Sequence, residues 1–444
     1  MPDFIPLSVL MLKPWDECTV VAGLFGEVSG KQFRDDVATM VSQLRARPEK
    51  RWTLCLYNSY NFAVAFMAAA YAGKELVLPG NLQPNALKAI ADSYDAIIND
   101  EFVANVNKFP FSRFAFHALD LDAISITLYT SGSSGVPKAI HKSLTQLAAE
   151  IQILENLWGG FLNSSLIAGT VSHQHIYGLL FRILWPLCAG RPFESGMREH
   201  PAQIADHGGS DVALISSPAL LKRIKAISKA THYRAVFSSG GVLPFSASIL
   251  SRKMLSITPI EVFGSTETGG IAFRSSSIEN TPWELFLPIE MKLNDDGCLC
   301  IKSPFTHQGN WHITADRGRM VSDRTFALQG RADRVIKVEE KRISLPEVEL
   351  HLQALEWIGE AVVFPRELNN RRMLCAVITL THVGQNKFNE IGPGRFWIML
   401  RTALRNSVEP VGIPRRYRVV EQISVDPQGK YSLTKMEKMF EENV

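Results

Sequence analysis

The stretch YTSGSSGVPKAIHKS, residues 129–143, decides the interpretation of this sequence. It continues the apolar run AISITLY, residues 123–129, and combines small hydroxyl residues with glycines and a lysine, Lys138. A loop that contains glycines loses much backbone entropy when it becomes ordered. We therefore ask whether a ligand compensates for this cost, or whether the segment is an ordinary solvated linker.

A strand that leads through such a loop into a helix is typical of phosphate-binding sites. Glycines allow several backbone N–H groups to point at one anion, hydroxyl groups add donors, and a lysine adds positive charge. Lys138 stands where its side chain could reach phosphate oxygens. The spacing G-x-x-x-x-G-K-[ST] of a Walker A loop is absent, so the loop is not of that type.

The composition is that of a globular protein of two or three domains, with 444 residues, 46% of them hydrophobic and 20% charged. A net charge of +3 is too balanced to indicate a nucleic-acid partner or a membrane surface. Lys13 and Pro14 end the N-terminal apolar run early, so we expect no signal peptide and no integral membrane segment. The six cysteines include no CxxC pair, which favours reduced thiols in a cytoplasmic protein.

Strands and helices alternate in the first part of the chain. Residues 52–57 and 75–79 form short apolar runs, and residues 61–73 between them are typical of a helix. Residues 143–160 predict a helix of about four turns. Such alternation is typical of parallel sheets that are covered by helices on both faces.

The sequence pattern changes after about residue 255, where short predicted strands are separated by Gly, Asn and Asp. From residue 331 onward, the pattern describes a small α+β domain. We therefore predict an α/β protein with a large N-terminal domain, residues 1–330, that contains parallel sheets and a small β region. A small mobile domain, residues 331–444, follows a hinge that must be short, because the boundary has no flexible linker composition.

Further motifs follow the loop along the chain. They are HQHIYG (173–178), SSGGVLP (238–244), FGSTETGG (263–270), WHITADRGR (311–319), GRADRVIKVEEKRISLPEVE (330–349) and QGKYSLTKM (428–436). Together with TSGSSGVPK (130–138), these segments resemble, in the same order, the motifs of the adenylate-forming ligases. That superfamily includes acyl-CoA synthetases, luciferases and the adenylation domains of peptide synthetases. The resemblance covers nearly the whole chain, which is shorter than most members before the loop.

The resemblance implies a reaction in two steps. A carboxylate first attacks the α-phosphate of ATP, which gives an acyl-adenylate and pyrophosphate. A phosphopantetheine thiol, on CoA or on an acyl carrier protein, then displaces AMP. The implied cofactors are therefore ATP, Mg²⁺ and this thiol.

The resemblance also assigns residues to the phosphates of ATP. Those expected to bind the β- and γ-phosphates are Thr130, Ser131, Gly132, Ser133, Gly135 and Lys138. Glu267 supplies the oxygen ligand that Mg²⁺ requires, and Thr266 donates to the α-phosphate. Lys430 orients the carboxylate and neutralises charge at the α-phosphate. The alternatives are a charge at a helix start for Glu267 and a solvated turn for Lys430.

The remaining nucleotide contacts follow from the later motifs. Gly240 and Gly241 lie in the adenine-side loop, and Phe263 with Gly264 lies against the adenine ring. Asp316 accepts the ribose hydroxyls, Arg331 holds ribose or phosphate, and Asp333 is the pivot of the hinge. Each has an ordinary alternative: a core aromatic for Phe263, a turn residue for Asp316, and a solvated side chain for Arg331.

The acyl pocket is expected beside these motifs. Its candidate residues are His175, Tyr177, Gly178, Val242, Val262, Thr268, Gly269, Gly270 and Ile271. None of those flanking the motifs is cationic, which favours a fatty or aromatic acid over an amino acid. Gly269 and Gly270 leave room for a chain or ring. For His175, which we also count with the catalytic residues, a core histidine that caps a helix is the alternative.

The acceptor thiol is indicated by a departure from the superfamily. Glu340 occupies a position that is usually glycine beside the pantetheine tunnel, and its charge disfavours free CoA. Basic residues of the C-terminal domain would suit an acidic acyl carrier protein: Arg366, Arg371, Arg372, Arg415, Arg416 and Arg418. The alternative is that these arginines form a solvated face and that Glu340 points to water. The short chain and the variant KVEEKRIS (337–344) resemble stand-alone ligases of lipid-like or aryl-polyene assembly systems. The alternative function is a degenerate ligase that only binds a nucleotide or acyl-adenylate.

Overall fold

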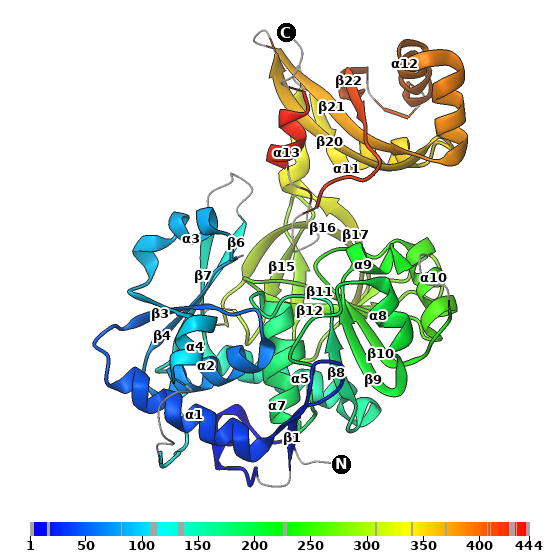
Figure 1. The fold of residues 1–444 in the computed structure, drawn as a ribbon. Helices are drawn as coiled ribbons and strands as arrows, with labels where there is room; N and C mark the ends of the chain where they lie inside the picture. Colours follow the sequence, from blue (N-terminus) through cyan, green and yellow to red (C-terminus); the bar gives the residue numbers. More distant parts are fainter. Residues whose placement is uncertain are drawn as a thin grey trace. The chain divides into compact units, whose positions relative to one another are not determined.

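The computed structural model describes residues 4–15, 18–80, 82–106, 113–131, 137–224, 229–306, 309–338, 341–368, 371–405, 407–408, 410–425, 431 and 433–440. The chain divides into two compact units. The first comprises Met1–Met291, Ile301–His312 and Ser322–Thr325, and the second comprises Lys292–Cys300, Ile313–Val321 and Phe326–Val444. Both contain helices and strands (Figure 1), which confirms the predicted α/β fold class.

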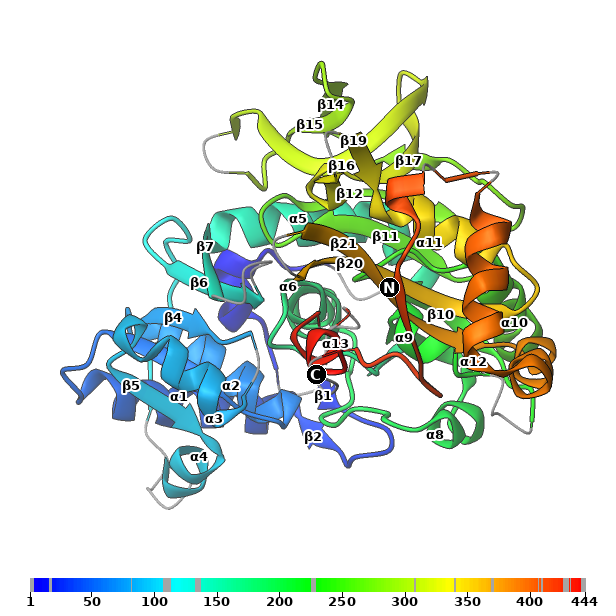
Figure 2. The same ribbon diagram turned by 90° about the horizontal axis from the view of Figure 1, so that it is seen from above.

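A five-stranded sheet in the first unit has the strand order β5-β3-β4-β6-β7. Its strands are β3 (Arg51–Cys55), β4 (Glu75–Leu78), β5 (Ala96–Asn99), β6 (Ser125–Ser131) and β7 (Pro137–Ser143). All pair in parallel except β7, which runs antiparallel to β6. Helix α2 (Ser59–Tyr71) contacts β3, β4 and helix α1 (Gly30–Arg45), as Figures 1 and 2 show. These elements confirm the helix and the two strands predicted between residues 52 and 79.

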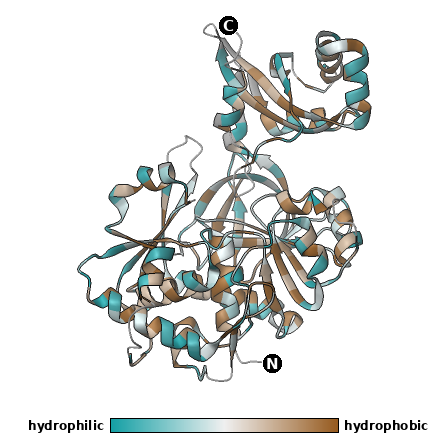
Figure 3. Ribbon diagram, viewed as in Figure 1, coloured by the Kyte–Doolittle hydropathy of each residue, from teal (hydrophilic) through white to brown (hydrophobic). Residues whose placement is uncertain are grey.

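A second sheet of the first unit follows the order β13-β12-β11-β10-β9-β8. Its strands are β8 (Leu166–Gly169), β9 (Gly209–Ser216), β10 (Tyr233–Ser238), β11 (Ile260–Ser265), β12 (Gly269–Ser275) and β13 (Trp283–Leu285). Strands β8 to β11 are parallel, and β12 turns back antiparallel to β11. Strands β9 and β10 carry buried aliphatic residues (Figure 3), which helices α9 (Pro218–Leu221) and α10 (Phe245–Leu255) cover.

The remaining elements complete the first unit and lead into the second. They are η1 (Leu7–Leu12), β1 (Thr19–Val21), β2 (Val28–Ser29), α3 (Pro84–Ala89), η2 (Ala91–Ser93), α4 (Asp100–Val106), α5 (Leu144–Leu162), α6 (Ile176–Gly178), the π-helix η3 (Leu179–Leu184), α7 (Trp185–Cys188) and α8 (Pro201–Asp206). Strands β14 (Glu290–Leu293), β15 (Cys298–Lys302), β16 (His312–Ser322) and β17 (Thr325–Arg331) then follow as consecutive neighbours in a sheet.

The second unit is built on a three-stranded sheet of order β20-β21-β22, with β20 (Ile358–Leu368), β21 (Arg371–Leu380) and β22 (Arg416–Val419). Alternate residues of β20 face opposite cores, because side chains along a strand have a period of two. Ala361 and Val363 belong to one core, and Val362 and Phe364 to the other. The other elements are η6 (Ala332–Arg334), β18 (Val335–Val338), β19 (Lys341–Ser344), α11 (Leu345–Gln353), α12 (His382–Leu404), η7 (Pro410–Gly412) and α13 (Leu433–Lys438).

The Gly/Ser loop connects two strands, which corrects the prediction that it leads directly into a helix. Strand β7 begins at Pro137, and its backbone pairs with β6 from Ser125 to Ser131. The helix begins only at Leu144, where Ser143 and Gln146 form a capping box. Lys138 therefore projects from a strand.

Two observations concern the predicted cellular setting. Among the described residues, no helix combines the length and the apolar character needed to cross a membrane. The six cysteines are all free thiols.

Candidate active site

Strand β7 directs two lysines towards the turn between β11 and β12. Lys138, Ile140 and Lys142 alternate along the strand and therefore lie on one of its faces. Along this face the residues become more buried, since Lys138 is exposed and Lys142 is only 5% exposed. Both side chains end at Glu267, which lies in that turn.

Lys138 forms an ion pair with Glu267. The distance from its Nζ to Glu267 Oε1 is 2.7 Å, and the side chains are 59% and 26% exposed. Burial alone would raise the pKa of Glu267, but the hydrogen bond and charge of Lys138 bring it below its ordinary value. Because Lys138 is exposed and Glu267 is partly exposed, the pair contributes little stability, and other ligands can replace either partner at low cost.

Lys142 holds the backbone of the same residue. Its buried Nζ donates to the carbonyl oxygen of Glu267 at 2.8 Å and to that of Phe305 at 2.6 Å. Burial lowers the pKa of Lys142 to about 8, although the charges of Glu150 and Glu267 oppose this shift. The ammonium group thus joins β7 to the Glu267 turn and to the segment around Phe305.

Glu150, from helix α5, holds the far end of this turn. Its Oε1 accepts a hydrogen bond from the backbone N–H of Gly270 at 2.7 Å, and the residue is 3% exposed. Burial raises its pKa to about 7, whereas the Gly270 hydrogen bond and the charge of Lys142 lower it.

The space beside Gly269 and Gly270 is filled, which corrects the prediction that these glycines leave room for an acyl chain. A Cβ at Gly269 would lie 2.5 Å from Glu150 Oε2 and 2.9 Å from the ring of Phe305. A Cβ at Gly270 would lie 2.7 Å from the ring of Phe286. Gly269 also has a φ of 69°, which favours glycine. Because Gly269 and Gly270 have no Cβ, the side chains of Glu150, Phe305 and Phe286 can pack against their backbone.

The turn itself is closed by its own hydroxyl groups. Thr268 is fully buried, and its Oγ1 accepts from the backbone N–H of Ser265 at 3.1 Å. The Oγ of Ser265 in turn accepts from the backbone N–H of Thr268 at 3.2 Å. Thr266, predicted to contact the α-phosphate, is half-buried in the same turn.

The segment predicted to bind adenine is tied to strand β11. Ser239 Oγ donates to the carbonyl oxygen of Val262 at 2.8 Å, and the N–H of Leu243 donates to Glu261 Oε2 at 2.9 Å. Gly240 has a φ of 90°, which suits the sharp turn between these anchors, and Gly241 is exposed beside it. The anchors fix the loop next to β11 and therefore next to Phe263.

The predicted pocket residues of β11, β12 and this loop differ in exposure. Val262 and Ile271 are buried, whereas Val242 is 53% exposed. Phe263 is half-buried, and its ring centroid lies 5.4 Å from that of Trp283. Only part of this group therefore presents side-chain surface to a ligand.

The HQHIYG segment is anchored by a residue that the sequence reasoning did not select. His173 is 2% exposed and contacts Ser59 Oγ through Nδ1 at 3.0 Å and the carbonyl oxygen of Leu56 through Nε2 at 2.9 Å. Arg182, also buried, donates to Ser59 Oγ and to the carbonyl oxygens of Val171 and Gly196. These hydrogen bonds of His173 and Arg182 fix the position of the HQHIYG segment.

The predicted residues of this segment, His175, Tyr177 and Gly178, come directly after His173 in the sequence. His175 is half-buried directly before helix α6, and its side chain forms no capping hydrogen bond. Gly178 is required by close packing, since a Cβ there would lie 2.0 Å from the carbonyl oxygen of Ser172. The ring centroid of Tyr177 lies 4.8 Å from that of Phe181.

In the second unit, Asp316 and Arg331 lie together. Arg331 Nη1 and Asp316 Oδ1 are 3.3 Å apart, and the Asp316 side chain is 19% exposed. The backbone N–H of Asp316 donates to Thr314 Oγ1 at 3.1 Å within strand β16, so Asp316 is a strand residue and not the turn residue of the alternative. The two residues predicted to contact ribose are therefore neighbours.

The predicted hinge lies beside a second ion pair. Asp333 is part of η6, and the next residue, Arg334, binds Glu349 through both guanidinium Nη atoms at 2.5 and 2.9 Å. Glu349 also accepts from the backbone N–H of Val363 at 2.7 Å. This arrangement fixes the chain directly after Asp333 to the sheet of the second unit.

Several predicted residues lie outside the described part of the chain. They are Gly132, Ser133, Gly135, Glu340 and Lys430. Thr130 is half-buried and pairs with Lys138 across β6 and β7, and Ser131 pairs with Pro137. The described ends of the loop, Ser131 and Pro137, therefore lie one strand position from Thr130 and Lys138.

A metal ion at this site would depend on few protein ligands. Among the described residues, no group of three His, Cys, Asp or Glu side chains could hold a metal ion. The partly exposed carboxylate of Glu267 is compatible with a Mg²⁺ ion that takes its other ligands from phosphates and water.

Known proteins resemble this chain in sequence and in fold. No protein-family model matches the chain. It is 25% identical over 342 residues to VraA of Staphylococcus aureus, a putative long chain fatty acid–CoA ligase, with 70% of each chain covered. It is 28% identical over 230 residues to the 4-coumarate–CoA ligase of Rhodobacter capsulatus, covering 51% of this chain and 56% of that enzyme. ATP-bound MatB from Rhodopseudomonas palustris has the same fold, with a TM-score of 0.80 at 16% identity over 99% of both chains.

The named sequence relatives of the chain are acid–CoA ligases, and its fold is that of an ATP-bound ligase structure. The resemblance based on the sequence motifs is therefore confirmed. In this chain, the lysine of the Gly/Ser loop motif and the glutamate of FGSTETGG form a direct ion pair.

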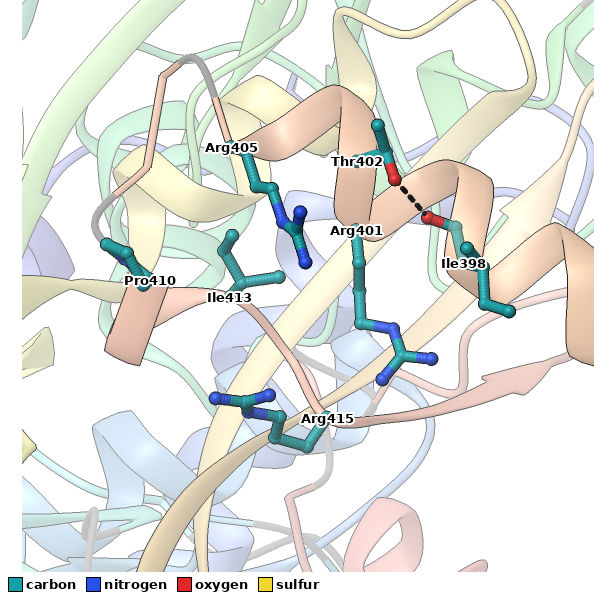
Figure 4. A pocket seen from close by; sticks show the side chains of 7 residues that line it. All are labelled: Ile398, Arg401, Thr402, Arg405, Pro410, Ile413 and Arg415. Carbon is teal, nitrogen blue, oxygen red and sulfur yellow. Dashed lines mark hydrogen bonds between the residues drawn. The ribbon is translucent and has the colours of Figure 1, made fainter.

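A basic hollow lies within the second unit (Figure 4). It has a volume of about 280 Å³. Its lining consists of Ile398, Arg401, Thr402, Arg405, Pro410, Ile413 and Arg415. The three guanidinium groups surround one space, and the described lining contains no acidic residue. Such an arrangement favours a phosphate or carboxylate group.

We predict that the close approach of β11 and β12 makes Gly264 essential for stability. A Cβ at this position would lie 2.2 Å from the carbonyl oxygen of Gly269. Gly264→Ala should lower the free energy of unfolding by about 3 kcal/mol. Gly160→Ala in helix α5 is the control, because its Cβ would meet no atom within 4 Å. Equal denaturant midpoints for the Gly264 variant and the wild type would contradict the packing.

We predict an acid-sensitive contribution from His173. Burial lowers its folded-state pKa from 6.5 to about 3, so its stabilising effect is complete above about pH 6.5 and is lost as the pH falls towards 3. Between pH 7 and 4.5, the wild type should lose of the order of 2–3 kcal/mol more than His173→Gln. Urea unfolding at both pH values measures this difference, with His232→Gln at an exposed position as control. Parallel losses in wild type and His173→Gln would contradict it.

Proposed function

We propose that this protein activates a carboxylic acid with ATP to an acyl-adenylate, and then transfers the acyl group to a phosphopantetheine thiol. The observation that carries the proposal is the contact between Lys138 and Glu267 at 2.7 Å. The contact places a lysine suited to phosphates beside a carboxylate suited to Mg²⁺, so both side chains are within reach of one triphosphate. The relatives, which include acid–CoA ligases, support the same reaction.

In this proposal, ATP separates the ion pair. The phosphates attract Lys138, and the carboxylate of Glu267 becomes available to Mg²⁺, whose charge would offset that of the phosphates. The Gly/Ser loop supplies backbone and hydroxyl donors from Thr130, Ser131, Gly132, Ser133 and Gly135. Thr266 donates to the α-phosphate from the turn that contains Glu267. The Lys138–Glu267 pair is weak enough to exchange, because both side chains reach solvent.

The remaining assignments concern the nucleoside and the moving domain. Asp316 accepts from the ribose hydroxyl groups while Arg331 orients the carboxylate, which their 3.3 Å separation supports. Phe263, Gly264, Gly240 and Gly241 border the adenine in our assignment. Lys430 completes the adenylation site. Asp333 is the residue whose dihedral angles change when residues 331–444 rotate for the second step.

The acid is proposed to be fatty or aromatic. The described residues near the candidate pocket that could meet an acyl group include Val242, His175 and Tyr177, and none is a lysine or arginine. A free amine would find no carboxylate among these three. The named activities of VraA and of the 4-coumarate–CoA ligase span the same two classes.

The acceptor is proposed to be an acyl carrier protein. The basic hollow at Arg401, Arg405 and Arg415 supports this choice, since an acidic carrier would be attracted to it. Arg416 and Arg418 lie on the adjoining strand β22. Nothing in the described residues favours the alternative of a binding module without activity, because the paired Lys138 and Glu267 are both retained.

We predict that adenylation depends on both members of the ion pair. Lys138→Met and Glu267→Gln should each lower acid-dependent exchange of labelled pyrophosphate into ATP by about 10²–10³-fold. The control is Lys302→Met, which removes an exposed lysine paired with Glu290 at 2.9 Å. A panel of fatty and aromatic acids in this assay identifies the substrate class. Binding of ATP without exchange for any acid would support the binding module instead.

We predict that the arginines of the basic hollow promote transfer of the acyl group to an acyl carrier protein. Arg401→Glu combined with Arg405→Glu should raise the KM for an acyl carrier protein by about tenfold or more, and the effect should shrink at high salt. Arg395→Glu, an exposed change on the same helix, is the control. Pyrophosphate exchange should be unaffected. Wild-type turnover that is efficient with free CoA and insensitive to these changes would contradict the choice of acceptor.

A further inference from the structure

Two buried ionisable side chains lie behind the Glu267 turn, and neither belongs to the proposed nucleotide contacts. Lys142 is 5% exposed and Glu150 is 3% exposed. Burying charged groups is unfavourable unless they are paired and hydrogen-bonded, and apolar residues of similar size are often at least as stable. Their presence at this point therefore calls for a purpose other than packing.

The two side chains hold opposite ends of one short segment. Lys142 Nζ binds the carbonyl oxygen of Glu267 at 2.8 Å, and Glu150 Oε1 binds the backbone N–H of Gly270 at 2.7 Å. Lys142 also binds the carbonyl oxygen of Phe305 at 2.6 Å. The segment from Glu267 to Gly270 is therefore fixed by its backbone, from strand β7 on one side and helix α5 on the other.

These contacts divide two tasks between the lysines of β7. Lys138 binds the carboxylate of Glu267 and is 59% exposed, so it can move to a phosphate. Lys142 binds the main chain of the same residue from a buried position, so its contact does not depend on where that carboxylate points. Once Lys138 has left, the described hydrogen bonds that hold the turn to β7 and α5 come from Lys142 and Glu150.

We propose that Lys142 and Glu150 are positioning residues that keep the Glu267 turn in place while Lys138 exchanges the Glu267 carboxylate for a phosphate of ATP. The carboxylate then remains where a divalent cation bound to the nucleotide can reach it. This inference rests on the proposed function, and it extends it to residues that contact neither substrate nor metal. The residues act through Glu267, as supporting groups behind a metal ligand generally do.

Three variants test the proposal. Lys142→Met removes the ammonium group and keeps an unbranched chain, and Glu150→Gln retains one carbonyl oxygen that can accept from Gly270. Glu155→Gln is the control: Glu155 lies on the same helix and forms a buried ion pair with Arg191 at 2.6 Å. All three changes disturb buried polar groups, but only the first two touch the Glu267 turn.

The primary readout is calorimetric binding of ATP to the full chain, with Mg²⁺ and with EDTA. We expect Lys142→Met to lose most of the Mg²⁺-dependent gain in ATP affinity, and to raise the Mg²⁺ concentration for half-maximal pyrophosphate exchange by about 10–100-fold. The KM for the acid should change by less than about twofold, because the acid does not contact this turn in the proposal. Glu150→Gln should act in the same direction but more weakly, and Glu155→Gln should leave the Mg²⁺ requirement unchanged.

The outcomes separate this inference from the proposed function. Absence of acid-dependent exchange in the wild type would overturn both. Normal exchange in the wild type together with an unchanged Mg²⁺ requirement in a folded Lys142→Met would overturn the inference alone. An equal rise in the Mg²⁺ requirement for Glu155→Gln would also overturn it, because the effect would then be general. If Lys142→Met does not fold, Glu150→Gln decides between the same two results.

Discussion

The ammonium group of Lys142 donates to the carbonyl oxygens of Glu267 and Phe305 in a buried part of the protein. The position of the turn that carries Glu267 depends on this contact. It joins the strand that follows the Gly/Ser loop to the turn that carries Glu267, although the two are 125 residues apart in sequence. Glu150 secures the other end of the turn, and the glycines at 269 and 270 allow its carboxylate to approach.

This arrangement explains how a weak ion pair can serve a demanding step. An exposed pair such as Lys138–Glu267 contributes little to stability, so the nucleotide can separate it without a large penalty. The backbone contacts of Lys142 and Glu150 are buried and do not have to change. Binding of ATP can therefore rearrange two side chains while the turn beneath them keeps its geometry, and preorganised groups of this kind require little reorganisation during reaction.

The sequence predicted the large features of the fold because they have local signals. The helix of residues 61–73 and its flanking strands follow from periodicity, and the order of the motifs indicates the superfamily. The alternation of Lys138, Ile140 and Lys142 is a strand signal, but the expectation of a helix after the loop concealed it. Glu150 could not be found in this way, since its contact with Gly270 spans 120 residues and leaves no local pattern. The sequence of Gly269 and Gly270 alone likewise does not reveal that the side chain of Glu150 fills the space beside them.

A structure of the protein with a non-hydrolysable ATP analogue and Mg²⁺ tests the central claim most directly. The account predicts that Lys138 Nζ leaves Glu267 and lies within hydrogen-bond distance of a phosphate oxygen. It also predicts that Lys142 Nζ remains bound to the carbonyl oxygen of Glu267, while the Glu267 carboxylate faces the metal ion. A bound nucleotide with the Lys138–Glu267 pair intact, or a metal-bound Glu267 whose carbonyl has left Lys142, would contradict it.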